Sequence, residues 1–369
     1  MRIPKFSEKE LEVVGETPPL FGMPGLPFFN YPCSMKEAVK ATFRRDPYWL
    51  IFGINMRMMT PAVIPDNIAR AFVFEANPVP PVTDGLVPDM FGIEWEYVPA
   101  VGGSMVRPGK PFAEDAWELL EKVQWPNPDE WDWKGSAKAN NGTYLKSDAY
   151  NIISFLNGWF ERLISMLDFE NALMALYDED QKEAVHKFFD RLTDLYITIF
   201  GRMIDAYPDI DGFSIHDDWG SQKETFFSPE LCAEMIVPYM RRVTDFLHSR
   251  GKTAELHSCG QNIKQVPNMI AAGWDAWFPQ NIVDSQLVYE MYGDKILVGV
   301  DPGISAEGKT EDEMRKAARD FVDRFMQPGK PCFYHYNLSA CTPAFCEELY
   351  SYSRKKCCDM AHRPSAMVT

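Results

Sequence analysis

The chain has little positive charge and no long apolar run. Its 369 residues include 37 basic and 53 acidic side chains, which give a formal net charge of −16. An acidic surface repels nucleic acid and anionic membranes, so neither is expected as a partner. No stretch approaches the roughly 18 uninterrupted apolar residues of a membrane-spanning helix. The first ten residues mix Lys with Glu and have no apolar core of a signal peptide. We therefore expect a cytoplasmic protein.

A Gly-rich dinucleotide-binding fingerprint is also missing after every predicted strand, which disfavours a Rossmann fold. Neither an internal repeat nor a low-complexity tract is present. The eight cysteines belong to a chain too long to need disulfide staples, and thiols in this context are buried, metal-binding or reactive. With 46% hydrophobic and 14% aromatic residues, the chain has ample material for one large core.

Helix-capping signals alternate with short apolar runs in the second half of the chain. Helices are predicted at about 34–45, 178–205 and 228–249, from Thr310, and from Pro343. Strands are predicted at 212–218, 253–259, 274–278, 296–301 and 332–337. Strands that alternate with helices in this way predict βαβ units and a parallel sheet.

Such a sheet either closes into a barrel or stays open and doubly wound. Because the dinucleotide fingerprint is missing, we predict an α/β fold of the (β/α)8 TIM-barrel class, with the barrel in residues 86–369. Residues 1–85 are rich in Pro and Gly and are predicted to be an N-terminal extension with one short helix. This extension either caps the barrel or forms the contact of a homodimer.

Polar residues fall on one face of three predicted strands. Alternation of side chains along a strand places the apolar residues on the other face, against the outer helices. The polar residues on this face are Ser214, His216 and Asp218 in the first strand, Thr253, Glu255, His257 and Cys259 in the second, and Asp301 in the third. They collect toward the carboxyl ends of the strands, where a barrel builds its active site.

The sharpest local signal is the His-Ser-Cys-Gly segment that begins at His257. His257 and Cys259 are two residues apart on a strand, so they point the same way and can bind one ion. An imidazole and a thiolate suit zinc, and a catalytic zinc site needs a third protein ligand and an open position. Three residues near the last strand could supply that ligand: Cys332, His335 and Cys341.

Several segments, in their order and spacing, resemble the uroporphyrinogen decarboxylase superfamily. They are DMFGIEWEY at 89–97, HDDWGSQ at 216–222, FSPE at 227–230, the His257-x-Cys259-Gly260 motif, and GVDP at 299–302. The segments are most similar to the corrinoid-dependent methyltransferase branch. The Arg-rich segment with which true uroporphyrinogen decarboxylases bind their substrate's carboxylates is missing from residues 1–60.

The resemblance implies a function and a set of residues. It implies that Zn²⁺ is held by His257, Cys259 and a third cysteine, for which we take Cys341. It further implies that Asp218 or His216 handles a proton and that Asp301 orients the site. The implied activity moves a methyl group between a small substrate and the cobalt of a corrinoid (cobalamin) carried by a separate partner protein. Within this branch we favour an aryl methyl ether as the donor, so that the enzyme is the methyltransferase component of an O-demethylase.

Three alternatives stay open. The first is a methylcobamide:thiol methyltransferase, in which zinc activates a thiol. The second is a decarboxylase without a metal, in which a carboxylate such as Asp218 faces pyrrole nitrogens. The third is a non-catalytic zinc protein, which would have a closed site with four protein ligands.

Overall fold

The computed structural model describes residues 4–16, 25–52, 56–100, 102–335 and 337–361. The chain divides into two compact units. The first unit consists of Met1–Met56, Asp148–Tyr150 and Asp284–Thr369, and the second of Arg57–Ser147 and Asn151–Val283.

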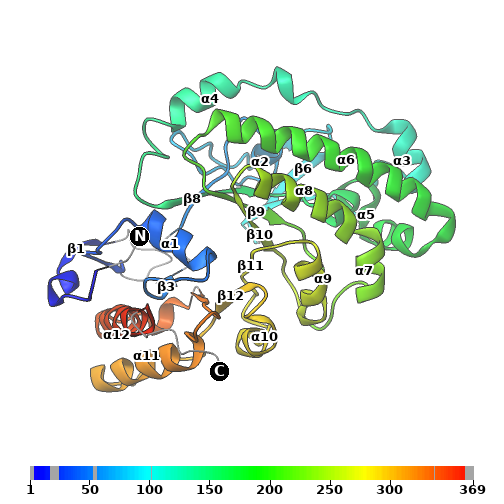
Figure 1. The fold of residues 1–369 in the computed structure, drawn as a ribbon. Coiled ribbons are helices and arrows are strands. Elements are labelled where there is room, and N and C mark those ends of the chain that lie inside the picture. Colours follow the sequence, from blue (N-terminus) through cyan, green and yellow to red (C-terminus); the bar gives the residue numbers. More distant parts are fainter. Residues whose placement is uncertain (1–3, 17–24, 53–55, 101, 336, 362–369) are drawn as a thin grey trace. The chain divides into compact units, whose positions relative to one another are not determined.

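The second unit is built on five sheet strands in the order β11-β10-β9-β8-β4, and β8 to β11 pair in parallel. These strands are β4 (Met56–Met59), β8 (Tyr150–Phe155), β9 (Gly212–His216), β10 (Thr253–His257) and β11 (Ala276–Trp277). The helices are α2 (Pro65–Ala69), α3 (Ala116–Lys122), α4 (Trp133–Asn140), α5 (Trp159–Tyr177), α6 (Glu179–Ala206), α7 (Pro229–Met235), α8 (Val237–Ser249) and α9 (Val266–Ala271), with short 3₁₀ turns at Pro128–Glu130 and Ile263–Gln265. Helices α3, α5 and α8 pack along α6, as Figure 1 shows.

A three-stranded antiparallel sheet precedes α3 in the second unit and was not predicted. Its strands are β5 (Leu86–Pro88), β6 (Glu94–Val98) and β7 (Gly103–Val106). The residues of β5 and β7 are mostly exposed or half-exposed, so they lack the continuous apolar run that marks the parallel strands.

The first unit contains three more parallel strands, in the order β12-β13-β3. They are β3 (Ile51–Phe52), β12 (Leu297–Val300) and β13 (Phe333–Tyr334). The first unit also contains an antiparallel pair of strands, β1 (Val13–Glu16) and β2 (Pro27–Phe29). The helices are α1 (Met35–Phe43), α10 (Ser285–Tyr292), α11 (Glu311–Phe325) and α12 (Pro343–Ala361), with 3₁₀ turns at Glu8–Leu11 and Leu338–Ala340. Helices α11 and α12 pack against each other.

Five strands in one unit and three in the other make an eight-stranded α/β system in which helices separate most of the strands. The predicted fold class, an α/β fold of the TIM-barrel type, is therefore confirmed. All five predicted strands are present, although each is shorter than predicted. The division of the chain at residue 85 stays a prediction.

One helix prediction was wrong in its continuity. The segment predicted as a single helix at 228–249 is two helices, α7 and α8, separated at Ile236, whose φ and ψ are −120° and −49°. Pro238 stands in the first turn of α8, where its missing N–H costs no hydrogen bond. In an uninterrupted helix the same proline would remove a bond and clash with the preceding turn.

The DMFGIEWEY segment is anchored by a buried ion pair. Arg162, on α5, donates from Nη1 to Asp89 Oδ2 at 2.5 Å and from Nη2 to Asp66 Oδ2, and all three side chains are buried. The second oxygen of Asp89 accepts the amides of Phe91 at 2.9 Å and Ile93 at 3.0 Å. Because removing one partner of a buried ion pair strands the others, this cluster fixes the segment to α5.

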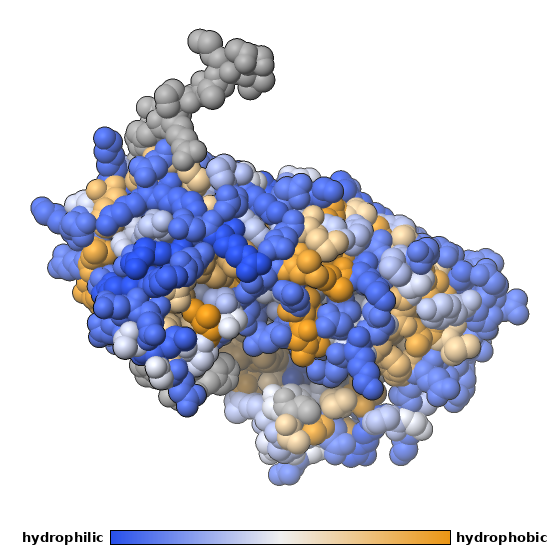
Figure 2. Space-filling view, turned by 90° about the horizontal axis from the view of Figure 1, so that it is seen from below, coloured by the Kyte–Doolittle hydropathy of each residue, from blue (hydrophilic) through white to orange (hydrophobic). Residues whose placement is uncertain are grey.

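The exposed surface is dominated by hydrophilic side chains. On the face seen in Figure 2, hydrophobic residues form separate patches among hydrophilic ones. Many of the exposed charges pair with each other, as Arg241 does with Asp245 at 2.8 Å. Exposed pairs of this kind contribute at most about 1 kcal/mol each. Within the described residues, no helix is long and apolar enough to cross a membrane.

Candidate metal centre

Two neighbouring strands of the second unit end in histidine. His216 is the last residue of β9 and His257 the last of β10, and the parallel register pairs them directly. Their rings are stacked, with centroids 4.7 Å apart and planes 15° apart. In Figure 1 the two strands lie side by side. The strand ends therefore bring two imidazoles together without help from a long loop.

One more donor follows each histidine, two residues further along the chain. Cys259 Sγ lies 3.4 Å from His257 Nε2, and Asp218 Oδ1 lies 3.6 Å from His216 Nε2. The amide of Cys259 donates to Asp218 Oδ1 at 2.6 Å, which joins the two strand ends. Potential ligand atoms of these four residues all lie within 4.8 Å of one another. All four side chains are partly exposed.

The loop that carries the thiol is tightly held. Asn262, which is buried, donates from Nδ2 to the carbonyl of Cys259 at 2.5 Å and to Ser258 Oγ at 2.9 Å. Gln280 Oε1 accepts the amide of Gly260 at 2.9 Å. Gly260 has φ of +96°, a backbone conformation that favours glycine. These contacts fix the direction of the chain directly after Cys259.

The environment of the cluster keeps His216 neutral and raises the pKa of the thiol. Burial lowers the pKa of His216 to about 4 against the opposing effect of Asp218. Burial, and then the Asp218 carboxylate, raise the pKa of Cys259 above its ordinary value. A neutral imidazole is the form that binds a metal, and a bound cation deprotonates a coordinating thiol.

The four donors fit a zinc ion. Imidazole nitrogen, thiolate sulfur and carboxylate oxygen are the three ligand types that zinc takes in proteins, at about 2.0–2.3 Å from the ion. Donor atoms around one ion are then about 3–4 Å apart, and the 3.4 Å and 3.6 Å separations of the two pairs lie in that range. The sequence placed His216 and Asp218 in proton transfer, whereas the geometry also makes them potential ligands.

A second layer of polar residues lies one step further back along the same strands. Ser214 and Glu255 are paired in register, and Ser214 Oγ donates to Glu255 Oε1 at 3.2 Å. Burial raises the pKa of Glu255 to about 8. These two residues share the predicted face of their strands with the histidines, but both are buried.

Sequence reasoning missed one acidic residue that touches the cluster. Glu161, in the first turn of α5, forms a hydrogen bond through Oε2 with His216 Nδ1. Burial raises the pKa of Glu161 to about 7, and Arg70 and Arg162 oppose this rise. A usable signal was present, because Glu161 follows β8 at the start of a helix, where a barrel places its active-site residues.

The other predicted site residues belong to the first unit. Asp301 Oδ1 accepts the amide of Gly303 at 2.7 Å and the Nδ2 group of Asn337 at 2.8 Å. Cys341 is buried, and its Sγ lies 3.5 Å from the carbonyl oxygen of Asn337. Cys332, the alternative third ligand, is also buried, and its thiol donates to the carbonyl of Phe325. The roles of Asp301, Cys341, Cys332 and His335 at the metal site stay predictions.

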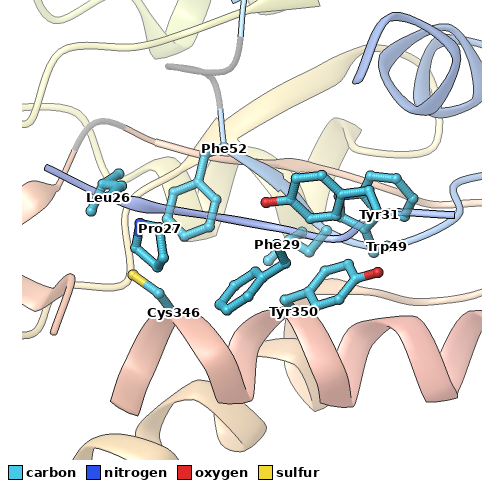
Figure 3. Close-up of a pocket in the computed structure, with 9 residues that line it drawn as sticks. Leu26, Pro27, Phe29, Tyr31, Trp49, Phe52, Cys346 and Tyr350 are labelled. Carbon is cyan, nitrogen blue, oxygen red and sulfur yellow. The ribbon is translucent and has the colours of Figure 1, made fainter. Parts of the chain in front are cut away.

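A small pocket, with a cavity volume of about 20 Å³, lies in the first unit and is shown in Figure 3. Its walls are mostly aromatic, and the rings pack on one another. Tyr31 and Trp49 are stacked with centroids 5.0 Å apart, and Phe29 and Tyr350 with centroids 5.3 Å apart. This ring packing accounts for part of the chain's high aromatic content, and the pocket contains no cluster of acid, base and metal ligands among its lining residues.

The family model described as uroporphyrinogen decarboxylase (URO-D) matches residues 82–346. Among solved structures, the chain is similar to a methyltransferase from Methanosarcina mazei, with a TM-score of 0.53 and 14% identity, over 90% of this chain and 100% of that one. A weaker likeness, with a TM-score of 0.30 and 10% identity, is to a chitinase from Chromobacterium violaceum and covers 58% of this chain and 80% of that one. Among curated proteins none matches.

Proposed function

Since the chain belongs to the uroporphyrinogen decarboxylase family and is an enzyme of that superfamily, we propose that it is a zinc-dependent methyltransferase. In this proposal it moves a methyl group between a small substrate and the cobalt of a corrinoid carried by a partner protein. The methyl donor is an aryl methyl ether, so that the reaction is an O-demethylation.

One observation carries the proposal: the cluster of His216, Asp218, His257 and Cys259 at the ends of β9 and β10. A decarboxylase without a metal has no need of a thiol beside two imidazoles. A structural zinc site is normally closed by protein ligands and shielded from solvent, whereas all four residues here are half-buried. The likeness in fold to a methyltransferase agrees with this proposal.

In the proposed site His257 Nε2 and Cys259 Sγ are the primary ligands and His216 Nε2 is the third, which leaves Asp218 beside the ion and one coordination position for the substrate. Cys341, the third ligand that the resemblance implies, stays a prediction. When bound, zinc supplies a Lewis acid that stabilises negative charge on the oxygen or sulfur from which a methyl group leaves or to which it is added.

The residues of the chain then have separate tasks. The Asp218 side chain is more exposed than that of His216, with 30% of its surface exposed against 17%. It is therefore the group that can hold or deliver a proton at a phenolate oxygen, a poor leaving group that needs protonation or charge stabilisation. The Cys259 amide orients Asp218 for this task through Oδ1. The role implied for Asp301, orienting the site, stays a prediction.

The experiment joins metal analysis to a methyl-transfer assay. Purified protein is expected to hold one equivalent of zinc and to methylate a Co(I) corrinoid when an aryl methyl ether is supplied. Cys259→Ala is expected to lose both zinc and methyl transfer while the fold survives. Cys33→Ala is the matched control, because Cys33 is a half-buried free thiol of the first unit.

Each other result points to a different conclusion. Release of carbon dioxide without a bound metal would replace the proposal with a decarboxylase. Methylation of a thiol in place of the corrinoid would keep the zinc site and change the substrate. Zinc without any transfer would indicate a structural site, and a Cys259→Ala protein with full activity would contradict the metal assignment.

A further inference from the structure

The contact between Glu161 and His216 determines which nitrogen of the imidazole is free. Glu161 bonds to Nδ1 of His216, and Nε2 is the nitrogen that lies 3.6 Å from Asp218 Oδ1 in the donor cluster. In its ionised form the Glu161 carboxylate can only accept, so His216 then donates its Nδ1–H to it. A neutral imidazole with its proton on Nδ1 presents a lone pair at Nε2, which is the form a metal ligand needs.

Glu161 is itself held from the opposite side. Arg70 Nη1 lies 3.7 Å from Glu161 Oε1, and both side chains are largely buried. The same nitrogen donates to the carbonyl of Leu156 at 2.9 Å and to Asn157 Oδ1 at 2.6 Å. Because Leu156 and Asn157 directly follow β8, the guanidinium is fixed to the sheet rather than to a mobile loop.

The backbone of Glu161 is tied to the same strand end as His216. Asp217, which is fully buried, accepts the amide of Glu161 at 2.9 Å and the amide of Phe160 at 3.3 Å. A Cβ at residue 158 would lie 2.4 Å from Asp217 Cβ, so Gly158 allows the helix to start this close to β9. Hydrogen bonds thus fix both the main chain and the side chain of Glu161. This distinguishes it from an acidic residue on the surface.

We propose that Glu161 is a positioning residue of the metal centre: with Arg70 behind it, it fixes the ring orientation and tautomer of His216 so that Nε2 faces the ion. This inference rests on the proposed function only in that the cluster binds zinc. It assigns the first turn of α5 and the residue that follows α2 to the metal site. Carboxylates that accept from a ligand histidine typically change metal affinity by about 10–100-fold when they are removed.

The test compares three variants of the full-length protein. Glu161→Ala removes the acceptor, whereas Glu161→Gln keeps an oxygen that can accept from Nδ1–H. Glu170→Ala is the matched control, because Glu170 is an exposed acid of the same helix α5. Zinc affinity is measured by competition with a chromophoric chelator, and cobalt(II) binding by visible absorption of the Co–thiolate complex.

We expect Glu161→Ala to bind zinc about 10–100-fold more weakly, Glu161→Gln to lose much less, and Glu170→Ala to be unchanged. A second readout needs no metal. In protein with ¹⁵N-labelled histidine, which has six histidines, the metal-free wild type should show His216 as the Nδ1–H tautomer. Glu161→Ala should show a mixture of tautomers, and His216→Gln identifies the signal.

The outcomes separate this inference from the proposed function. If wild-type protein binds neither zinc nor cobalt, the proposed function fails and the inference fails with it. If wild type binds zinc and Glu161→Ala binds it equally well, only the inference is overturned. An Nε2–H tautomer in the wild type, or equal losses in Glu161→Ala and Glu170→Ala, would also overturn it. Should Glu161→Ala fail to fold, the tautomer of His216 in the wild type still decides the question.

Discussion

Replacing Gly260 with alanine tests whether the loop after Cys259 depends on close backbone contact. A Cβ at this position would lie 2.2 Å from the carbonyl carbon and oxygen of Gly220 and 2.5 Å from its Cα. These atoms belong to the main chain, so no side-chain rotation relieves the overlap. One of the two loops must move, and either movement displaces a donor of the metal centre, since Asp218 lies two residues before Gly220 and Cys259 one residue before Gly260.

The expected cost has two parts. Alanine at φ of +96° costs about 1–2 kcal/mol because its Cβ meets its own backbone. The overlap with Gly220 adds about 1–3 kcal/mol, the usual cost of overpacking. Gly260→Ala should therefore lower the free energy of unfolding by about 2–5 kcal/mol and weaken zinc binding.

Gly251 provides the control. It has φ of +68°, and a Cβ there would meet no atom within 4 Å, so Gly251→Ala should cost only the first part, about 1–2 kcal/mol. Urea unfolding followed by tryptophan fluorescence measures both variants, and chelator competition measures zinc affinity. Equal costs in the two variants, or a Gly260→Ala protein with wild-type zinc affinity, would refute the reasoning.

Two further predictions concern charge. Arg162→Met leaves the buried Asp66 without its cation and should lower the free energy of unfolding in urea by about 3–5 kcal/mol. Arg241→Met, at an exposed ion pair, should lower it by at most about 1 kcal/mol. Similar losses in the two variants would contradict the role of the buried ion pair. A hydrogen bond to Asp275 raises the pKa of His248 above its ordinary value of 6.5. A group whose pKa is higher in the folded than in the unfolded state stabilises the fold at pH values below its unfolded-state pKa. This stabilisation is lost as the pH rises through the folded-state pKa. His248→Gln should therefore cost more stability at about pH 5.5 than at about pH 9, by less than about 1 kcal/mol because both side chains are partly exposed; a cost that grows with pH would contradict it.

Local signals correctly placed four of the five helices that were predicted. Ser34, Asp178 and Thr310 each accept an N-terminal amide of the helix that they cap, and α1, α6 and α11 begin directly after them. These side chains act on their own helix, so their effect can be seen within a few residues of sequence. Pro238 was the same kind of local signal, and giving it weight would have predicted the break between α7 and α8.

The site could be predicted only in part, because local patterns show which face of a strand a side chain lies on but not which strands pair. Strand alternation placed His257 and Cys259 on one face, and the structure brings their side chains within 3.4 Å. The partners His216 and Asp218 were on the expected face of their own strand, but the register between β9 and β10 was needed to pair them. Glu161 and Arg70 are separated by 91 positions in the chain, so no periodicity connects them to the histidines.

The segment at 89–97 shows the same limit. It resembles a family motif, but its first residue meets a cation 73 positions away on α5. A buried arginine looks in the sequence like any surface arginine, because burial depends on the complete fold. Long-range ion pairs of this kind therefore become visible only in three dimensions.

All four donors of the cluster come from one stretch of 44 residues, between His216 and Cys259, inside a single compact unit. Occupancy by an ion is thermodynamically linked to folding, because a ligand that binds only the native state adds its binding free energy to stability. Zinc at 100 times its dissociation constant would contribute about 2.7 kcal/mol, and that gain falls on the unit that holds the donors. With zinc bound as proposed, chelation should therefore lower the melting temperature of the second unit first.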